Sequence, residues 1–273
     1  MSKIYVVGIG PGGPEDMTFR AVRAISGADV IVGYSAYIDL IKDLFPGKNF
    51  ISSGMTREVE RCELVLEKAR EGNNVALVSS GDSGIYGMAG IMLEVAGKAG
   101  EARCAGEAGE AGKAGDAGNA GAAGEAGKSG DDIVIEVIPG VTAASAAASI
   151  LGAPVMHDFA VISLSDLMTP WELIVKRIEY AALGDFVICI YNPKSKKRSD
   201  YINIARDIII KSRRSETPVG IVRNAGRQDE SHVITTLGEM LECEIDMFTV
   251  IIVGNSGTYT QDGKMITPRG YRL

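Results

Sequence analysis

The sequence has few of the residues that build metal centres, disulfide frameworks or nucleic-acid surfaces. Its 273 residues include four cysteines and two histidines, and the cysteines are scattered without a Cys-x-x-Cys pair. Neither a zinc site nor a disulfide framework is therefore predicted. The net charge of −7 argues against nucleic acid as a partner, because nucleic-acid binders usually carry a basic domain or stripe.

Long apolar runs are missing as well. No run reaches the ~18 residues that suggest a membrane span. The N-terminus enters a strand without the apolar segment and cleavage site of a secretory signal. A hydrophobic content of 46% with 23% charged residues is typical of a globular protein with a real core. We therefore expect a soluble, cytoplasmic protein with no membrane partner.

The sequence does contain short β-branched runs that alternate with segments of helical period. In the first half, strands are expected at 4–7, 30–32, 75–78 and 133–138, with a first helix at 15–25. Such alternation predicts βαβ units and a parallel sheet. Pro14 suits the first turn of that helix, and Glu15 and Asp16 suit its positive end.

The second half is expected to form a separate α/β domain. Its predicted strands are 160–164, 186–191, 219–222, 232–236 and 249–253, and its predicted helices are 171–180, 201–212 and 237–241. Between the halves, an alanine-rich helix at 143–151 is followed by Gly152-Ala153-Pro154, which would end it. We place an N-terminal domain at 1–157 and a C-terminal domain at 158–273.

Residues 97–131 interrupt this pattern with triplets such as Ala-Gly-Glu and Ala-Gly-Lys. Glycine at every third position is typical of collagen, but a collagen helix needs abundant proline, and this segment has none. Glycine also costs a helix about 1 kcal/mol per position relative to alanine. The pattern favours a flexible surface insertion, which adds little loop-closure entropy.

The loop at 8–13 matches Gly-x-Gly-x-x-Gly between a strand and a helix, which is the context of a dinucleotide-binding fold. That fold also needs an acidic residue at the end of its second strand, and none follows 30–32. Pro11 and Pro14 lack the backbone donors that would hold a diphosphate. The nicotinamide interpretation is weakened, and a turn needed only for tight packing remains an alternative.

Two further small-residue turns follow predicted strands of the first domain. Residues 79–87, which include Asp82, follow one strand, and Pro139-Gly140-Val141-Thr142 follows another. The carboxyl ends of parallel strands are where open α/β sheets bind ligands. Asp82, Ser83 or Thr142 could instead simply cap a helix. Because all three turns are expected at one edge of the sheet, we predict a binding site there.

With these loops, the chain resembles the tetrapyrrole (corrin/porphyrin) methylases over nearly its whole length apart from the insertion. The motifs concerned are Gly8-Ile9-Gly10-Pro11-Gly12, Gly81-Asp82 with Tyr86-Gly87, Ile138-Pro139-Gly140-Val141-Thr142-Ala143, Ile190-Tyr191-Asn192-Pro193 and Thr217-Pro218-Val219-Gly220-Ile221-Val222-Arg223-Asn224-Ala225. Within the family, residues 80–87 and 191–195 resemble the branch that methylates C17 of precorrin-3B or its cobalt form in cobalamin biosynthesis.

The resemblance implies two α/β domains, the first with a mainly parallel sheet and the second with a mixed sheet. It also implies a homodimer, and S-adenosylmethionine bound in a cleft between the domains. This cofactor is a sulfonium cation without phosphate, so its binding does not need the amide donors that the prolines of the first loop lack. Carried over position by position, the cofactor residues are Pro11, Gly81, Asp82, Ser83, Ile85, Thr142, Ala143, Asn192 and Ala225.

The implied substrate is a macrocycle with many carboxylates, whose ring contracts on methylation. A basic cluster follows the predicted turn at Asn192, and we expect it to bind those carboxylates, although a solvated basic loop is the plainer alternative. Its members are Lys194, Lys196, Lys197 and Arg198. No general acid or base can be assigned, and His232 is the weak candidate because histidine titrates near neutrality.

Three alternatives stay open. The first is another methyltransferase of the same fold, acting on a different precorrin, a diphthine precursor or ribosomal RNA. The second is a nicotinamide dinucleotide-binding protein that uses the loop at 8–13. The third is a non-catalytic interaction protein in which residues 97–131 are the working part.

Overall fold

The computed structural model describes residues 1–100, 102–104, 133–195 and 199–271. The chain divides into two compact units. The first unit comprises Met1–Gly10 and Pro14–Gly140, and the second comprises Pro11–Gly13 and Val141–Leu273. Each unit is described by itself.

The first unit contains a six-stranded sheet in the order β3-β2-β4-β1-β6-β5, and every neighbouring pair is parallel. The strands are β1 Lys3–Gly8, β2 Val30–Tyr34, β3 Asn49–Ser53, β4 Val75–Ser79, β5 Ala102–Cys104 and β6 Ile133–Ile138. The helices are α1 Phe19–Gly27, α2 Ser35–Ile41, α3 Glu58–Arg70 and α4 Ala89–Ala99, with 3-10 turns at Pro14–Asp16 and Lys42–Leu44. The predicted parallel sheet is confirmed.

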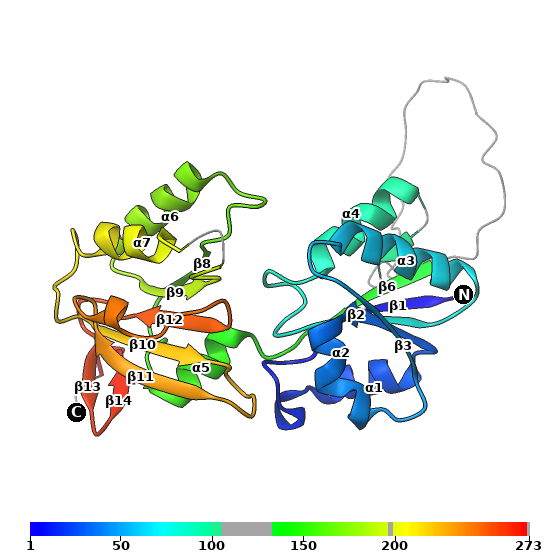
Figure 1. The fold of residues 1–273 in the computed structure, drawn as a ribbon, viewed down its shortest axis with the longest axis horizontal. Helices are drawn as coiled ribbons and strands as arrows, with labels where there is room; N and C mark the ends of the chain where they lie inside the picture. The colour runs from blue at the N-terminus through cyan, green and yellow to red at the C-terminus, as the bar shows by residue number, and fades with distance from the viewer. Residues whose placement is uncertain (101, 105–132, 196–198, 272–273) are drawn as a thin grey trace, which may run out of the picture. The chain divides into compact units, whose positions relative to one another are not determined.

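Helices cover both faces of this sheet, with α3 and α4 on one side and α1 and α2 on the other (Figure 1). Alternate strand residues supply the two cores, as strand geometry requires. Val32 and Leu77 pack with Val65 of α3 and Met92 of α4. On the opposite face, Ile31 and Val78 belong to the cluster that includes Ile25 of α1 and Ile38 of α2. Burial on both faces explains why these strands are continuous apolar runs.

The structure corrects three details of the first half. The helix predicted at 15–25 starts later, at Phe19, because the Thr18 hydroxyl accepts a hydrogen bond from the Ala21 amide and caps it. Strand β3 and helix α3 were not among the predicted elements. The insertion predicted at 97–131 overlaps two described elements, since α4 continues to Ala99 and β5 pairs with β6. Residues 101 and 105–131 of the predicted insertion lie outside the described residues.

The second unit contains a five-stranded sheet in the order β11-β10-β12-β9-β8 and a three-stranded sheet in the order β13-β14-β7. Its strands are β7 Gly152–Ala153, β8 Phe159–Ser163, β9 Val187–Tyr191, β10 Pro218–Arg223, β11 Ser231–Thr236, β12 Thr249–Val253, β13 Tyr259–Gln261 and β14 Lys264–Ile266. Its helices are α5 Ala143–Leu151, α6 Trp171–Leu183 and α7 Tyr201–Ile209. Because β8 and β9 are parallel and the other pairs of the larger sheet are antiparallel, the predicted mixed sheet is confirmed.

Helices α6 and α7 pack on one face of the larger sheet, and α5 packs on the other. Gly220 allows α5 to approach, since a Cβ at that position would lie 2.7 Å from Leu151 Cδ2. The helix predicted at 237–241 is wrong, because only a 3-10 turn at Met240–Glu242 forms there. By its contacts α5 belongs to the second unit, whereas the predicted domain boundary at 157–158 assigns it to the first; that boundary stays a prediction.

Candidate functional site

Three glycine loops meet at the carboxyl edge of the parallel sheet in the first unit. A Cβ added to Gly8 would lie 2.6 Å from the Gly81 carbonyl oxygen and 2.9 Å from the Gly140 nitrogen. Real side chains do not make such contacts, so glycine is needed for the three backbones to approach. The predicted convergence of the turns after β1, β4 and β6 is therefore present in the structure.

The backbone amides of Ile9 and Gly10 in the first loop are already used within the unit. Gly10 and Gly81 exchange two hydrogen bonds, with N···O distances of 3.1 and 2.7 Å, and the Ile9 amide donates to the Ser79 carbonyl. The first α-helix after the loop begins only at Phe19. A diphosphate cradle needs free amides at a helix N-terminus. This loop lacks that arrangement, which further weakens the nicotinamide interpretation.

The Asp82 carboxylate ties the second loop to the third. Its Oδ2 accepts a hydrogen bond from the Gly140 amide at 3.0 Å, and its Oδ1 accepts one from Gly84 at 2.8 Å. Ser83 is fully buried and donates to the Ile138 carbonyl at 3.0 Å. Neither residue caps α4, whose N-cap is Met88. Both residues therefore shape the loops, and Asp82 keeps lone pairs for further donors.

Ile85, another predicted cofactor residue, is 40% exposed on the same loop. Its neighbour Tyr86 is 57% exposed and has a φ of 54°. Asn192 and Asn224, each just past a strand end of the second unit, have φ values of 51° and 52°. A positive φ is uncommon outside glycine, although asparagine tolerates it, and such positions are enriched at functional sites. All three positions lie in motifs that carry the family resemblance.

In the second unit, the phenol of Tyr191 anchors the start of α5. Tyr191 Oη accepts a hydrogen bond from the Ala144 amide at 2.7 Å and lies 2.6 Å from Thr142 Oγ1. Thr142 occupies the N-cap position but makes no capping bond with its own side chain. The end of β9 thus positions the predicted cofactor residues Thr142 and Ala143.

Asn192, the residue after Tyr191, is exposed, and its Nδ2 donates to Ser163 Oγ at 2.9 Å. Ser163 ends the neighbouring strand β8, so this bond joins two strand ends. Lys194 of the predicted basic cluster is exposed. Lys196, Lys197 and Arg198 lie outside the described residues.

Pro11 and Ala225 are linked through Arg227. Arg227 Nε donates to the Pro11 carbonyl at 3.1 Å, and its guanidinium carbon lies 5.7 Å from the centroid of the Phe248 ring. Ala225 is buried two residues before Arg227. Gly12 packs tightly on Gly226, since a Cβ at Gly12 would lie 2.9 Å from the Gly226 carbonyl oxygen. These contacts explain why Pro11–Gly13 of the first loop belong to the second unit.

His232, the weak catalytic candidate, is exposed on β11 and lines a small cavity of about 130 Å³ together with Arg223 and Glu244. Arg223 Nε donates to Asp246 Oδ2 at 2.7 Å, and this bond raises the pKa of the guanidinium. Burial opposes ionisation of Asp246, but hydrogen bonds from Phe248 N, Thr249 and Arg223 hold the pKa of that carboxyl below its usual value. None of these contacts marks His232 as a proton donor or acceptor.

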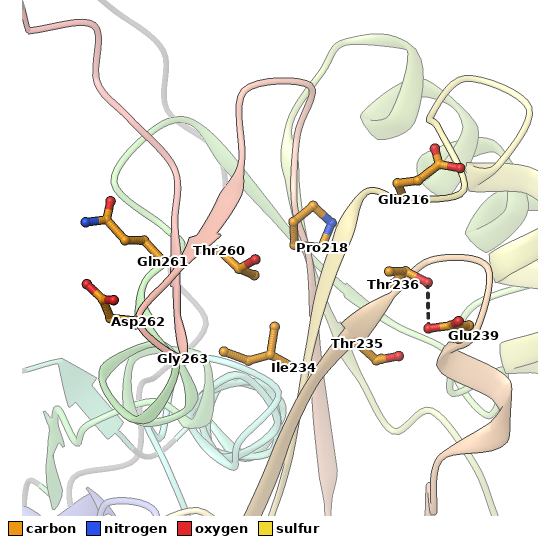
Figure 2. Close-up of a pocket in the computed structure, with 10 residues that line it drawn as sticks. All are labelled: Glu216, Pro218, Ile234, Thr235, Thr236, Glu239, Thr260, Gln261, Asp262 and Gly263. Atoms are coloured by element: carbon orange, nitrogen blue, oxygen red, sulfur yellow. Dashed lines mark hydrogen bonds between the residues drawn. The ribbon is translucent and has the colours of Figure 1, made fainter.

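A larger cavity of about 450 Å³ lies between β10, β11 and the β13–β14 hairpin. Figure 2 shows Glu216, Glu239 and Asp262 among its lining residues, together with threonines and the Glu239–Thr236 hydrogen bond at 3.2 Å. The lining includes none of the predicted site residues. This cavity is therefore separate from the candidate site.

Two residues that support the site were missed from the sequence. Tyr191 stands in a motif that carries the resemblance, but its neighbour Asn192 was assigned instead. Arg227 follows the last motif and gave no signal, because its contact with Pro11 joins residues from opposite ends of the chain. None of the described helices is long and apolar enough to span a membrane.

Comparison with known proteins places these features in a family. The model of the Tetrapyrrole (Corrin/Porphyrin) Methylases matches residues 3–105 and 111–241. The chain is 47% identical to the Probable cobalt-factor III C(17)-methyltransferase of Salmonella typhimurium, over 99% of this chain and 100% of the relative. It is 46% identical to the Cobalt-factor III methyltransferase of Priestia megaterium, of which it spans 45%. It is 35% identical to the Precorrin-3B C(17)-methyltransferase of Sinorhizobium sp, over 98% and 96% of the two chains.

Solved structures agree with this result. The crystal structure of the methyltransferase CobJ matches with a TM-score of 0.80 and 29% identity, over 98% of this chain and 100% of that chain. Uroporphyrin-III C-methyl transferase from Thermus thermophilus, complexed with S-adenyl homocysteine, matches with a TM-score of 0.64 and 22% identity, over 93% and 97% of the two chains. The predicted fold and the predicted enzyme class, a C17-type methyltransferase of cobalamin biosynthesis, are confirmed. The chain belongs to the tetrapyrrole (corrin/porphyrin) methylases.

Proposed function

We propose that this enzyme transfers a methyl group from S-adenosylmethionine to C17 of the cobalt-containing tetrapyrrole cobalt-factor III, with contraction of the ring. The choice of substrate rests on the difference in sequence identity between this chain and two of its relatives. A full-length relative named for cobalt-factor III is 47% identical, whereas the relative named for precorrin-3B is 35% identical. The sequence alone left open whether the substrate carries cobalt, and the higher identity to the relative named for cobalt-factor III favours a cobalt-containing substrate.

The donor set of the site fits S-adenosylmethionine better than a dinucleotide. The amides of Ile9, Gly10 and Gly81 are satisfied by backbone carbonyls, so they cannot hold a diphosphate. A sulfonium nucleoside carries no phosphate, and Asp82 offers a carboxylate for its hydroxyl or amino groups. When bound, S-adenosylmethionine supplies the electrophilic methyl group that a ring carbon attacks.

The residues proposed to hold the cofactor are the same ones that the family resemblance implied in the sequence analysis. They are Pro11, Gly81, Asp82, Ser83, Ile85, Thr142, Ala143, Asn192 and Ala225. The buried Ser83 acts through the shape of its loop, and the Tyr191 phenol fixes Thr142 and Ala143 at the start of α5. The main contribution of the chain is alignment of the reactants, which lowers the entropic part of the barrier.

The basic cluster that begins at Lys194 is proposed to bind acid groups of the substrate, and the protein is proposed to act as a cytoplasmic homodimer. Replacement of Lys194 by alanine is expected to weaken tetrapyrrole binding without changing the affinity for S-adenosylhomocysteine. Sedimentation equilibrium of the full chain tests the dimer. A monomer at micromolar concentration would contradict it.

The direct test is incubation of the purified protein with S-adenosylmethionine and either cobalt-factor III or precorrin-3B. Mass spectra are expected to show the gain of one methyl group, and absorption spectra a changed macrocycle, with faster turnover of the cobalt form. Equal or better turnover of precorrin-3B would overturn the choice of substrate. Binding of NAD in place of S-adenosylhomocysteine would instead favour the nicotinamide alternative.

A further inference from the structure

A buried arginine in the first unit has no role in the proposed function so far. Arg61, near the start of α3, is 4% exposed. Its Nε donates to Ser53 Oγ at 2.7 Å, its Nη2 to the Gly54 carbonyl at 2.8 Å, and its Nη1 lies 3.6 Å from Met88 Sδ. Among the described residues, its acceptors are therefore all uncharged, and one of them is a weak thioether.

These contacts provide no negative charge to balance the positive charge of the guanidinium. A buried charge is costly unless it is paired, and the positive end of a helix dipole adds to the cost near the start of α3. A guanidinium has five N–H donors, and three are used by described residues. Gly54 is exposed and Ser53 half-buried, so the charge lies one layer below the surface. These features favour an anionic acceptor from a ligand.

A second, independent observation lies on the same face of the sheet. Ser79, at the end of β4, is 4% exposed, and its Oγ has no hydrogen-bond partner among the described residues. Leu77, two residues earlier, packs in the core beneath α3 and α4, so Ser79 faces the same helices. Ser53, the partner of Arg61, faces that side for the same reason, since Ile51 packs against this core.

Strand register places both serines at the carboxyl edge. Ser53 pairs with Tyr34 of β2, and Gly33 pairs with Val78 of β4, so the ends of the three adjacent strands lie level. Adjacent strands are about 4.8 Å apart, which puts the two serine positions roughly 10 Å from each other. Ser79 also pairs with Gly8, the centre of the glycine loops. Hydrogen-bond donors are thus present at two points of this sheet edge, at Arg61 beside Ser53 and at Ser79.

We propose that Arg61 and Ser79 form a subsite for acid side chains of the tetrapyrrole, with Arg61 binding a carboxylate through charge-assisted hydrogen bonds. The inference rests on the proposed function, which supplies a substrate with several carboxylates. It assigns substrate recognition to the first unit, in addition to the basic cluster in the second. If Arg61 served only to hold β3 to α3, its replacement would disturb folding or the nearby loop and would not act on the tetrapyrrole selectively.

The test compares Arg61→Gln with Arg57→Gln. Glutamine keeps an amide that can donate to the Gly54 carbonyl, while the charge is lost. Arg57 is a matched control because its side chain is 63% exposed beside Glu60. Binding of cobalt-factor III is titrated by absorption in the presence of S-adenosylhomocysteine, and S-adenosylhomocysteine binding is measured separately. Arg61→Gln is expected to weaken tetrapyrrole binding roughly 10- to 100-fold, with S-adenosylhomocysteine binding and the Arg57→Gln control unchanged.

A second variant keeps the inference testable if Arg61→Gln does not fold. Ser79→Ala removes a hydroxyl without a described partner, so the free protein should keep its stability, while tetrapyrrole binding falls by roughly 3- to 10-fold. Unchanged tetrapyrrole affinity in a folded Arg61→Gln protein, or in Ser79→Ala, would overturn the subsite. An equal loss of S-adenosylhomocysteine affinity would do the same. Failure of the unmodified protein to bind the tetrapyrrole would overturn the proposed function itself.

Discussion

The two units hold their candidate site residues by different means. In the first unit, the loops after β1, β4 and β6 pack backbone against backbone, and Gly8 and Gly140 leave no room for a Cβ. In the second unit, side chains take this role. The Tyr191 phenol fixes the start of α5, and the Arg227 guanidinium holds the Pro11 carbonyl.

The difference has a consequence for how mutations act. A backbone contact fails as a whole when a side chain is inserted, because the neighbouring atoms cannot rotate away. A side-chain contact can be removed by a substitution that deletes only a few atoms. The fold then stays in place, and only the position of a loop changes. Substitutions at the glycine contacts of the first unit should therefore act on stability, and those at Tyr191 and Arg227 should act mainly on ligand affinity.

The largest effect is expected for Gly8→Ala. The new methyl group would lie 2.6 Å from the Gly81 carbonyl oxygen and 2.8 Å from the Ser83 nitrogen, both of them backbone atoms. We expect a loss of about 3 kcal/mol or more in the free energy of unfolding, measured by urea denaturation. The control is Gly90→Ala in α4, where a Cβ meets nothing within 4 Å and alanine should stabilise the helix by up to about 1 kcal/mol. Equal stability of the two variants would refute the backbone argument.

The second effect tests the side-chain arrangement. Tyr191→Phe removes the phenol's hydrogen bonds with Thr142 Oγ1 and the Ala144 amide and leaves the ring in place. We expect S-adenosylhomocysteine affinity, measured by calorimetry, to fall roughly tenfold, with about 1–2 kcal/mol lost in unfolding. Tyr180→Phe, at a side chain that is 68% exposed, should change neither quantity. A variant that loses stability but keeps full affinity would show that the phenol does not position the proposed cofactor residues.

A smaller, pH-dependent effect is expected for Asp246→Asn in the second unit. Because the folded pKa of Asp246 is lowered, its ionised form stabilises the protein above the unfolded value near 3.8, and this contribution disappears as the pH falls through the folded pKa. At pH 7 the variant should lose about 1 kcal/mol, and the difference from the unmodified protein should shrink below about pH 4. Thermal unfolding across pH checks this, with Asp262→Asn as the exposed control. A difference that is constant with pH would contradict the assignment.

The smallest effect is expected for Arg227→Gln, which removes a half-buried guanidinium from the Pro11 carbonyl and the Phe248 ring. We expect S-adenosylhomocysteine affinity to fall by about threefold, because a partly exposed contact of this kind contributes little. Stability should stay close to that of the unmodified protein. A loss as large as that of Tyr191→Phe would mean that Arg227 itself contacts the ligand.

The sequence predicted the parts of the site that depend on backbone geometry. Glycines directly after buried strands indicate tight turns at the sheet edge, and the convergence of the turns at Gly8, Gly81 and Gly140 followed from strand topology alone. The parts that depend on long side chains were not predicted. Nothing in the local pattern tells that the Tyr191 phenol caps a helix that begins at Ala143, or that Arg61 lacks a charged partner among the described residues.

Some elements of the fold were missed for a related reason. β3, with the sequence Asn-Phe-Ile-Ser-Ser, is short and only partly buried at the side of the sheet, so its apolar signal is weak. The β13–β14 hairpin is largely exposed, and β14 is stabilised by pairing with the two residues of β7. Strand propensity depends on such tertiary neighbours, which a single sequence does not reveal.

The mutual hydrogen bonds between Gly10 and Gly81, together with the close approach of Gly140, bear on the order of folding. These three residues are distant in sequence, so the contacts between them close long loops and form slowly. During synthesis, the edge cannot be completed before β6 and Gly140 have left the ribosome. We therefore expect the glycine loops of the first unit to be among its last parts to form, so that ligand binding at that edge would report that folding of the unit has finished.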